Sequence, residues 1–299
     1  MVKALDLFCG AGGAGWGLLN AGWDAVGVDC WGQALRVHRA NVGPTLQLDL
    51  LDPRRWGELP VAKLVWASPP CQDHSAARRG QPGKGRDGWP VVAWYAKRHR
   101  PRAILVENVP GAPWVEWSHT LRGLGYHTQP QIVDAQWFGV PQTRRRGILV
   151  ATLDPLPLGL VPGELVGKTG PSMGDALPLL RGIHAPKGGK QSGYLVYPQG
   201  GTVPGWLDRP APTVTCQEVR GTRASEASGW RFNGGPDRAS DAAFLACGVR
   251  RLTVEDCAIL QGFPVHRWDW LDTSKQGSYK MVGNAVPPAV AEHFARLVR

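Results

Sequence analysis

The stretch ALDLFCGAGGAG, residues 4–15, decides the fold, because it joins an apolar strand to a glycine-rich turn and the start of a helix. Glycines in such a turn let the backbone approach a ligand closely. Asp29, an acid at the end of the next apolar run, is placed to hydrogen-bond ribose hydroxyls. The turn satisfies GxGxxG through Gly10, Gly12 and Gly15, a pattern that fits a dinucleotide, S-adenosylmethionine or a tight turn without a ligand.

Outward from this turn, residues 1–150 alternate short apolar runs with longer amphipathic segments. Such alternation predicts an α/β fold, a Rossmann-like, doubly wound and mainly parallel sheet covered by helices on both faces. Ligands of this fold bind at the carboxyl ends of the strands. Polar motifs end the predicted strands there, at Asp6–Gly15, Asp29, Asp49, Pro69–Gln72 and Glu107–Val109. Asp49 is placed to read an adenine amino group, although an Asp there is more often a helix N-cap.

The composition changes after about residue 150. Residues 151–250 are rich in Gly and Pro and show little periodicity, which is typical of a small, irregular domain. A helix resumes at Val254–Leu260, and VPPAVAEHFARLVR closes the chain as a helix with Pro in its first turn. We therefore predict one domain at 1–150, completed by about 265–299, and a smaller one at 151–264.

The overall composition favours a soluble, intracellular globular protein. The chain has 299 residues, 43% of them hydrophobic, and no apolar run long enough to span a membrane. Its six cysteines show no CxxC pair and no metal-type His spacing, so neither a disulfide framework nor a metal site is expected. The net charge of +10 suits a polyanionic partner, although many basic proteins bind no nucleic acid.

Cys71 is the candidate nucleophile. It follows the apolar run KLVWAS and two prolines, and it opens the loop QDHSAARRGQPGKGRDG. A lone cysteine at a strand end is usually a small buried apolar residue. Here, however, Pro69 and Pro70 fix the backbone direction, and a basic loop containing Arg78 and Arg79 favours the thiolate. The glycines of this loop would let it close over a substrate.

Two further motifs place polar groups beside apolar strands. Glu107 ends the run AILV, where a carboxyl is either simply solvated or, facing a pyrimidine ring nitrogen, makes the ring accept a thiolate. Gln142, Arg144 and Arg146 precede the run GILVAT at alternate positions, so their side chains are expected to point the same way. Arginines there can fix a phosphate, hold Glu107, steady a base or form a solvated basic edge.

Taken in order, these segments resemble the DNA cytosine-5 methyltransferases from residue 4 to residue 290, apart from the middle. The blocks that match are Asp6–Gly13, Pro70-Cys71-Gln72, Glu107–Val109, Phe138–Arg146, Gln261–Pro264 and Gly283–Pro288. The sequence departs from the family pattern at Cys30, where a bulky apolar residue is usual, and at His74, where an aromatic residue is common.

The resemblance implies a sequence-specific enzyme that uses S-adenosylmethionine, yields S-adenosylhomocysteine and acts on double-stranded DNA. Its catalytic residues would be Cys71, Glu107, Arg144 and Arg146. Its cofactor-binding residues would be Phe8, Gly10, Gly12, Asp29, Asp49, Leu50, Pro70, Asn284 and Val286. The stretch 151–264 would be the target recognition domain, and DNA contacts would come from Gln72, Ser75, Arg78, Arg79, Gln142, Arg209, Thr213, Thr215, Arg220 and Arg223.

The mechanism that the resemblance implies starts with a cytosine flipped out of the duplex, because carbon 6 is inaccessible in the base stack. Cys71 then attacks carbon 6, Glu107 engages the ring nitrogen and the exocyclic amine, and carbon 5 receives the methyl group. We expect a cytoplasmic monomer of bacterial or phage type that binds no membrane, acting alone or beside a cognate restriction endonuclease.

The sequence leaves three alternatives open. A tRNA cytosine methyltransferase shares the catalytic blocks, but a smaller recognition region is expected for it. A nicotinamide oxidoreductase explains the glycine-rich turn and Asp29, but it leaves Cys71 and Glu107 without a role. A catalytically inactive DNA-binding module is disfavoured by the presence of both residues.

Overall fold

The computed structural model describes residues 2–70, 87–156, 159–180, 194–196, 202–204, 209–211, 213–214, 250–271 and 273–299. The chain divides into two compact units. Unit 1 comprises Met1–Phe138, Arg145–Gly167 and Ala285–Arg299, and unit 2 comprises Gly139–Arg144 and Lys168–Asn284. The short segment Gly139–Arg144 therefore belongs to unit 2, although both of its flanks in the sequence belong to unit 1.

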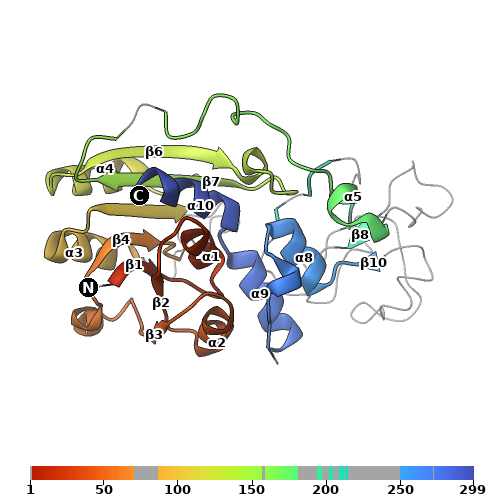
Figure 1. Ribbon diagram of the computed structural model, residues 1–299, viewed down its shortest axis with the longest axis horizontal. Coiled ribbons are helices and arrows are strands. Elements are labelled where there is room, and N and C mark those ends of the chain that lie inside the picture. Colours follow the sequence, from red (N-terminus) through yellow and green to blue (C-terminus); the bar gives the residue numbers. More distant parts are fainter. Residues whose placement is uncertain are drawn as a thin grey trace. The chain divides into compact units, whose positions relative to one another are not determined.

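Unit 1 is built on a seven-stranded sheet with the strand order β3-β2-β1-β4-β5-β7-β6 (Figure 1). The strands are β1 (Val2–Leu7), β2 (Ala25–Asp29), β3 (Thr45–Gln47), β4 (Ala62–Ala67), β5 (Ala103–Asn108), β6 (His127–Asp134) and β7 (Arg145–Thr152). Neighbours among β1 to β5 pair in parallel, whereas β7 is antiparallel to both β5 and β6. The predicted Rossmann-like, doubly wound and mainly parallel sheet is confirmed.

The helices of unit 1 cover this sheet. They are α1 (Gly13–Asn20), α2 (Gly32–Asn41), α3 (Trp89–His99), α4 (Trp114–Gly123) and α10 (Pro288–Leu297), with short 3-10 helices at η1 (Pro53–Glu58) and η3 (Ala135–Phe138). One core cluster joins alternate strand residues such as Leu5, Leu7 and Ile104 to α3 and α4. At its centre the rings of Trp89 and Trp117 stack with centroids 4.8 Å apart, so the two helices are fixed to each other as well as to the sheet.

The helix that closes the chain packs on the first helix. It begins at Pro288, as predicted, and Trp23 donates its indole N–H to the Ala295 carbonyl at 3.1 Å. A Cβ added at Gly17 of α1 would lie 2.4 Å from the Pro288 carbonyl oxygen. Only glycine therefore allows α1 and α10 to approach this closely.

Unit 2 contains a small sheet with the order β10-β8-β9, formed by Arg250–Arg251, Tyr194–Val196 and Thr202–Pro204. Its helical elements are α5 (Met173–Ala176), η4 (Pro178–Leu180), α8 (Val254–Gln261), η5 (Val265–Arg267) and α9 (Lys275–Asn284). Thr253 caps α8 by accepting a hydrogen bond from the Asp256 N–H at 3.1 Å. The Tyr279 hydroxyl of α9 donates to the Leu252 carbonyl at 2.6 Å, which ties α9 to the start of α8.

Candidate active site

The candidate site lies at the carboxyl edge of the sheet of unit 1. Strands β1, β2, β4 and β5 run in parallel and end next to one another at Leu7, Asp29, Ala67 and Asn108. The predicted Phe8, Asp29, Pro70 and Glu107 therefore come to one edge, where ligands of this fold bind.

The glycine-rich turn is braced by Asp29. Its Oδ2 accepts from the Gly10 N–H and its Oδ1 from the Trp31 N–H, each at 2.9 Å. The turn is tightly wound, because Phe8 has a φ of 61° and Gly10 a φ of 52°. Each Asp29 oxygen keeps a second lone pair for another donor, such as a ribose hydroxyl.

The glycines of the turn also make room for His38 of α2, which sequence reasoning missed. A Cβ at Gly15 would lie 2.8 Å from His38 Nε2, and one at Gly12 would lie 2.7 Å from Val42 Cγ2. A Cβ at Gly10, in contrast, would meet nothing within 4 Å. Gly12 and Gly15 thus serve packing, while Gly10 faces open space that a ligand can occupy. A histidine on an amphipathic helix gives no sign of this role in the sequence.

Asp6 and His38 form a fully buried pair beneath the turn, with Oδ2 and Nε2 3.9 Å apart. Burial, with the nearby charge of Asp29, raises the pKa of Asp6 well above its usual value. Burial also lowers the pKa of His38 to about 4. Both shifts favour the neutral form of each side chain.

The next strand ends carry Asp49 and Leu50. Asp49 is exposed and its Oδ1 accepts from the Leu51 N–H at 3.0 Å, whereas Leu50 is buried. Burial and then the charges of Asp29 and Asp49 raise the pKa of the Cys30 thiol. Cys30 therefore shares one region of the edge with both carboxylates.

Asn108 of β5 binds the backbone at Pro69, two residues before Cys71. Its amide nitrogen donates to the Pro69 carbonyl at 3.1 Å, and its oxygen accepts from the Val109 N–H at 2.8 Å. Cys71 itself lies outside the described residues, as do Gln72, Ser75, Arg78 and Arg79. Asn108 thus joins the ends of β4 and β5 just before the predicted nucleophile, a role that its place in the Glu-Asn-Val motif did not reveal.

Glu107 is paired with Arg146. The Arg146 Nε lies 3.0 Å from Glu107 Oε1, and the two side chains are 17% and 10% exposed. The pairing follows from the sheet, because antiparallel β7 sets Gly147 opposite Asn108 and Ile148 opposite Glu107. A mostly buried carboxylate is thereby given a cation partner and a fixed orientation.

Gln142 and Arg144 lie in unit 2, before β7 begins at Arg145. Gln142 is fully buried and donates to the Leu260 carbonyl at 3.0 Å and to Gln261 Oε1 at 2.6 Å. The Gln142 amide is thus engaged inside the protein, and its contact with DNA stays a prediction. Of the three residues expected to point the same way, Gln142 and Arg144 precede β7, and Arg146 lies within it.

Arg144 is buried as well. Its guanidinium donates to the Val214 carbonyl at 2.9 Å and to the Gly283 carbonyl at 3.1 Å. Both acceptors are backbone groups of unit 2, so Arg144 holds the backbone there. Sequence reasoning had assigned it to the catalytic set, and a role in orienting the backbone was not predicted.

The remaining predicted residues are distributed between the units. In unit 2, Arg209 is exposed, Asn284 is exposed at the end of α9, and the Thr213 hydroxyl donates to the Thr143 carbonyl at 2.7 Å. Val286 is buried in unit 1. Thr215, Arg220 and Arg223 lie outside the described residues.

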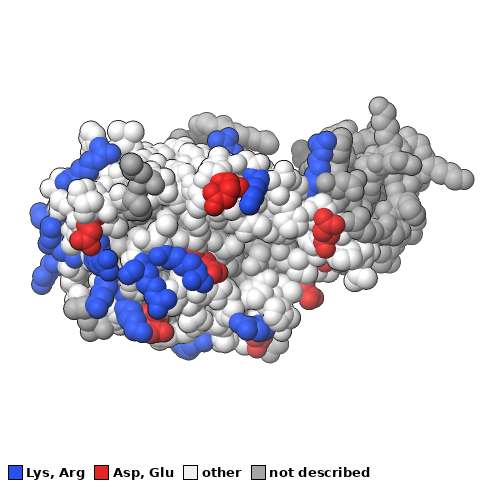
Figure 2. All heavy atoms as spheres, turned by 45° about the horizontal axis from the view of Figure 1, so that its top comes forward, with Lys and Arg blue, Asp and Glu red and all other residues white. Residues whose placement is uncertain are grey.

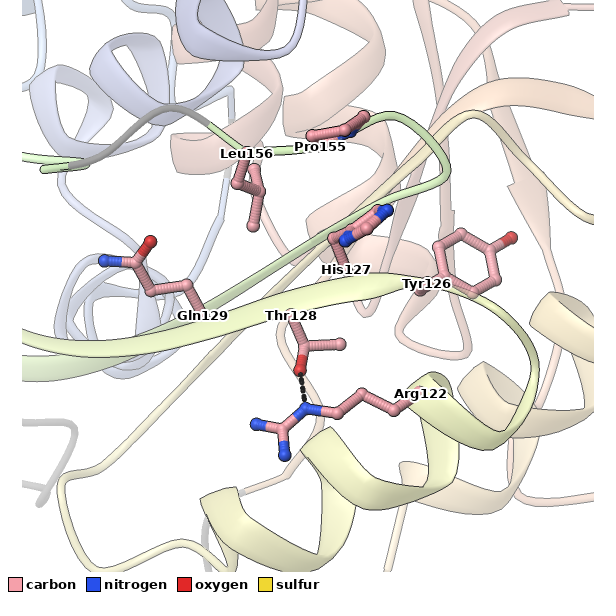
Figure 3. A pocket seen from close by; sticks show the side chains of 7 residues that line it. All are labelled: Arg122, Tyr126, His127, Thr128, Gln129, Pro155 and Leu156. Carbon is pink, nitrogen blue, oxygen red and sulfur yellow. Dashed lines mark hydrogen bonds between the residues drawn. The ribbon is translucent and has the colours of Figure 1, made fainter.

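A separate pocket of about 390 Å³ lies in unit 1 at the start of β6 (Figure 3). Its lining consists of Arg122, Tyr126, His127, Thr128, Gln129, Pro155 and Leu156. His127 pairs with Thr152, which pairs with Ala103 at the beginning of β5. The pocket is therefore at the opposite edge of the sheet from Glu107, and no predicted catalytic or cofactor residue lines it.

Basic side chains gather on the face of unit 1 drawn in Figure 2, over the part where α3 and α4 lie in Figure 1. Exposed members near the end of α3 are Lys97, Arg98, Arg100 and Arg102. Among the described residues, no helix is long and apolar enough to cross a bilayer. In the same ranges, no group of three or more His, Cys, Asp and Glu side chains could hold a metal ion.

The strand order, with one antiparallel strand beside β5, and the polar carboxyl edge define a class I methyltransferase fold. Two solved structures share it: S. pombe Dnmt2 methyltransferase, with a TM-score of 0.65 and 20% identity, and a Spodoptera frugiperda DNMT2 variant, with a TM-score of 0.67 and 16% identity. Each alignment covers 100% of this chain, and 98% and 99% of the respective structure. At these identities the likeness shows the fold alone.

The family model for C-5 cytosine-specific DNA methylases matches residues 2–169 and 213–298, so the chain belongs to this family and is a DNA cytosine-5 methyltransferase. Similar proteins include the Type II methyltransferase M.AplI of Arthrospira platensis, which is 26% identical over 99% of this chain and 85% of its own length. The Type II methyltransferase M.HindV of Haemophilus influenzae is 27% identical over 99% of this chain and 96% of its own. Family membership implies DNA as substrate and a bound methyl donor.

Proposed function

We propose that the enzyme methylates carbon 5 of a cytosine flipped out of double-stranded DNA, through a covalent bond between Cys71 and carbon 6. The observation that carries this proposal is the pair Glu107–Arg146 beside Asn108, because Asn108 joins the strand of Glu107 to Pro69, two residues before Cys71. A carboxyl group and a thiol that follow adjacent strands could act on the same pyrimidine ring, the carboxyl at the ring nitrogen and the thiol at carbon 6.

The proposed reaction starts with addition of the Cys71 thiolate to carbon 6. The bond from sulfur to carbon 6 forms while the ring double bond moves its electrons toward carbon 5, and the Glu107 carboxyl engages the ring nitrogen that takes up charge. Arg146 keeps that carboxyl oriented at 3.0 Å. After carbon 5 is methylated, it loses its proton and the bond to sulfur breaks, which restores the double bond and frees Cys71.

The glycine-rich turn fits S-adenosylmethionine. Open space lies where a Cβ of Gly10 would be, and Asp29 keeps acceptor capacity beside it. Phe8, Gly10, Asp29, Asp49, Leu50 and Pro70, with Gly12 behind the turn and Asn284 and Val286 from the last motif, are the residues proposed to hold the cofactor. When bound, S-adenosylmethionine supplies the methyl group.

Unit 2 contains most of the stretch that we propose for target recognition. Its exposed Arg209, with Thr215, Arg220 and Arg223, remains the proposed source of DNA contacts. Gln72, Ser75, Arg78 and Arg79 would act from the loop that follows Cys71, with cations on the phosphates. We further propose a monomer, serving with or without a cognate restriction endonuclease.

A duplex carrying 5-fluorocytosine tests the covalent step, because fluorine cannot leave carbon 5 as a proton does and the adduct accumulates. Wild-type enzyme with S-adenosylmethionine should give a stable protein–DNA adduct, and Cys71→Ser should give none. Cys30→Ser, which removes an exposed thiol at another position, should retain the adduct. No adduct with the wild type, or an undiminished one with Cys71→Ser, defeats the mechanism.

The target site requires a second measurement. Bisulfite sequencing of DNA from cells that express the protein would reveal the methylated sequence and the base within it. A matched tRNA substrate in the same assay separates the proposed DNA activity from tRNA methylation. Methylation of the tRNA alone would contradict the substrate assignment.

A further inference from the structure

Two short segments of unit 2 pair side by side: one is residues 141–144, and the other contributes Ala211, Thr213 and Val214. The Thr143 N–H donates to the Ala211 carbonyl at 2.7 Å, and the Ala211 N–H donates to the Pro141 carbonyl at 2.9 Å. Gln142 and Ala211 form a parallel β-bridge. The Thr213 hydroxyl adds a bond to the Thr143 carbonyl at 2.7 Å. These segments, which we call the clamp, are far apart in sequence and fixed in register.

Gln142 ties the clamp to α8. Its Oε1 accepts from the Val214 N–H at 2.9 Å, while its Nε2 donates to Leu260 and Gln261 at the end of the helix. A fully buried amide that uses both its oxygen and its nitrogen is sensitive to any change in spacing. Loss of Gln142 would leave the Val214 N–H and the Leu260 carbonyl buried with one partner fewer.

The clamp continues along the backbone to Arg146, the residue that pairs with Glu107. Arg144 donates from the clamp to the Val214 and Gly283 carbonyls, and Arg145 begins β7. Arg146, two residues beyond Arg144, pairs with Glu107 at 3.0 Å. Arg146 therefore follows the last residue of the clamp by two positions along the backbone, a length of at most about 7 Å.

We propose that Gln142 is a positioning residue for Glu107, which it aligns by holding the clamp and, through the backbone of Thr143–Arg145, the side chain of Arg146. The inference rests on the proposed role of Glu107 in catalysis.

The test compares Gln142→Leu with wild type in single-turnover and steady-state methylation assays. We expect kcat to fall by about tenfold or more, since hydrogen bonds of this kind each contribute about 1 kcal/mol. The KM values for DNA and S-adenosylmethionine should stay within about twofold, because the Gln142 side chain is fully buried. Gln142→Asn, which keeps both amide functions on a shorter side chain, should give a smaller loss and serves if Gln142→Leu does not fold.

A double-mutant cycle with Arg146→Lys separates positioning from general destabilisation. If Gln142 acts through Arg146, Gln142→Leu should cost little more activity once Arg146 is replaced. Ser172→Ala is the matched control, because it removes the capping box of α5 in the same unit without touching the clamp. It should lower stability and leave kcat unchanged.

Hydrogen exchange in the protein without ligands gives a readout independent of activity. Gln142→Leu should speed exchange of the amides of Thr143 and Val214, and of Gly147 in β7. Additive losses in the cycle, a pure rise in the KM for DNA, or unchanged exchange in β7 would each overturn the inference. A wild type that methylates no cytosine DNA would defeat the proposed function, and the inference with it. If wild type and Gln142→Leu are equally active, the inference about Gln142 fails while the proposed function stands.

Discussion

Arg146 pairs with Glu107 at 3.0 Å in a site where both side chains are mostly buried. Glu107→Gln keeps the shape of the side chain and removes the acid function. We expect kcat to fall by about 10²–10⁴, the usual range for a general acid or base. Calorimetry should show S-adenosylmethionine binding within about twofold of wild type, and a variant with normal kcat would remove Glu107 from the proposed mechanism.

His38 makes the folded state sensitive to acid. Its pKa falls from 6.5 in the unfolded chain to about 4, because the buried ring resists protonation. This contribution to stability is present above pH 6.5 and is lost as the pH falls toward 4. The shift corresponds to about 3 kcal/mol.

Denaturant unfolding at pH 7 and pH 4 measures this effect in wild type and His38→Gln. The variant should lose up to about 3 kcal/mol less than wild type over this interval. Asp6, whose raised pKa acts in the opposite direction, is present in both proteins, so its own contribution largely cancels. Equal losses in the two proteins would show that His38 is protonated when folded.

The contact between helices α1 and α10 has no space for a side chain at Gly17. Gly17→Ala places a methyl 2.4 Å from the Pro288 carbonyl oxygen, so the helices must separate. We expect a loss of about 1–3 kcal/mol in the free energy of unfolding. Gly123→Ala at the end of α4 is the control, because its Cβ would meet nothing within 4 Å. If Gly17→Ala proves as stable as Gly123→Ala, the helices are not in such close contact.

The elements were predictable where periodicity and chemistry agree. The alternation of residues 1–150 predicts the parallel sheet, and the strand-end rule brings Asp29 and Glu107 to one edge. Periodicity does not determine strand order, so the sequence could not show that antiparallel β7 would deliver Arg146 to Glu107. The burial of Gln142 was not predictable, because its spacing from Arg144 and Arg146 does not reveal that its amide donates to the Leu260 carbonyl at the end of α8.

The two edges of the sheet of unit 1 carry different features, an ion pair at one and a pocket at the other. Glu107 and its partner Arg146 lie at the carboxyl edge, and the pocket around Arg122 and His127 lies at the other. Arg122→Ala removes the bond to Thr128 in that pocket. We expect kcat and both KM values to stay within about twofold of wild type, as is usual for a surface substitution away from the chemistry. A marked loss of methylation would mean that the pocket takes part in turnover.

The division of the chain restricts how its specificity can be re-engineered. Gly139–Arg144 belongs to unit 2. If only the segment equivalent to residues 168–284 were replaced by that of a relative, Gln142 and Arg144 of the original chain would have to form their hydrogen bonds with a foreign segment. A chimera should therefore exchange both pieces together, with junctions at 138/139, 144/145, 167/168 and 284/285. Unit 2 is thus one structural unit made of two separate lengths of chain, and the shorter length supplies backbone and side-chain partners that the longer one needs.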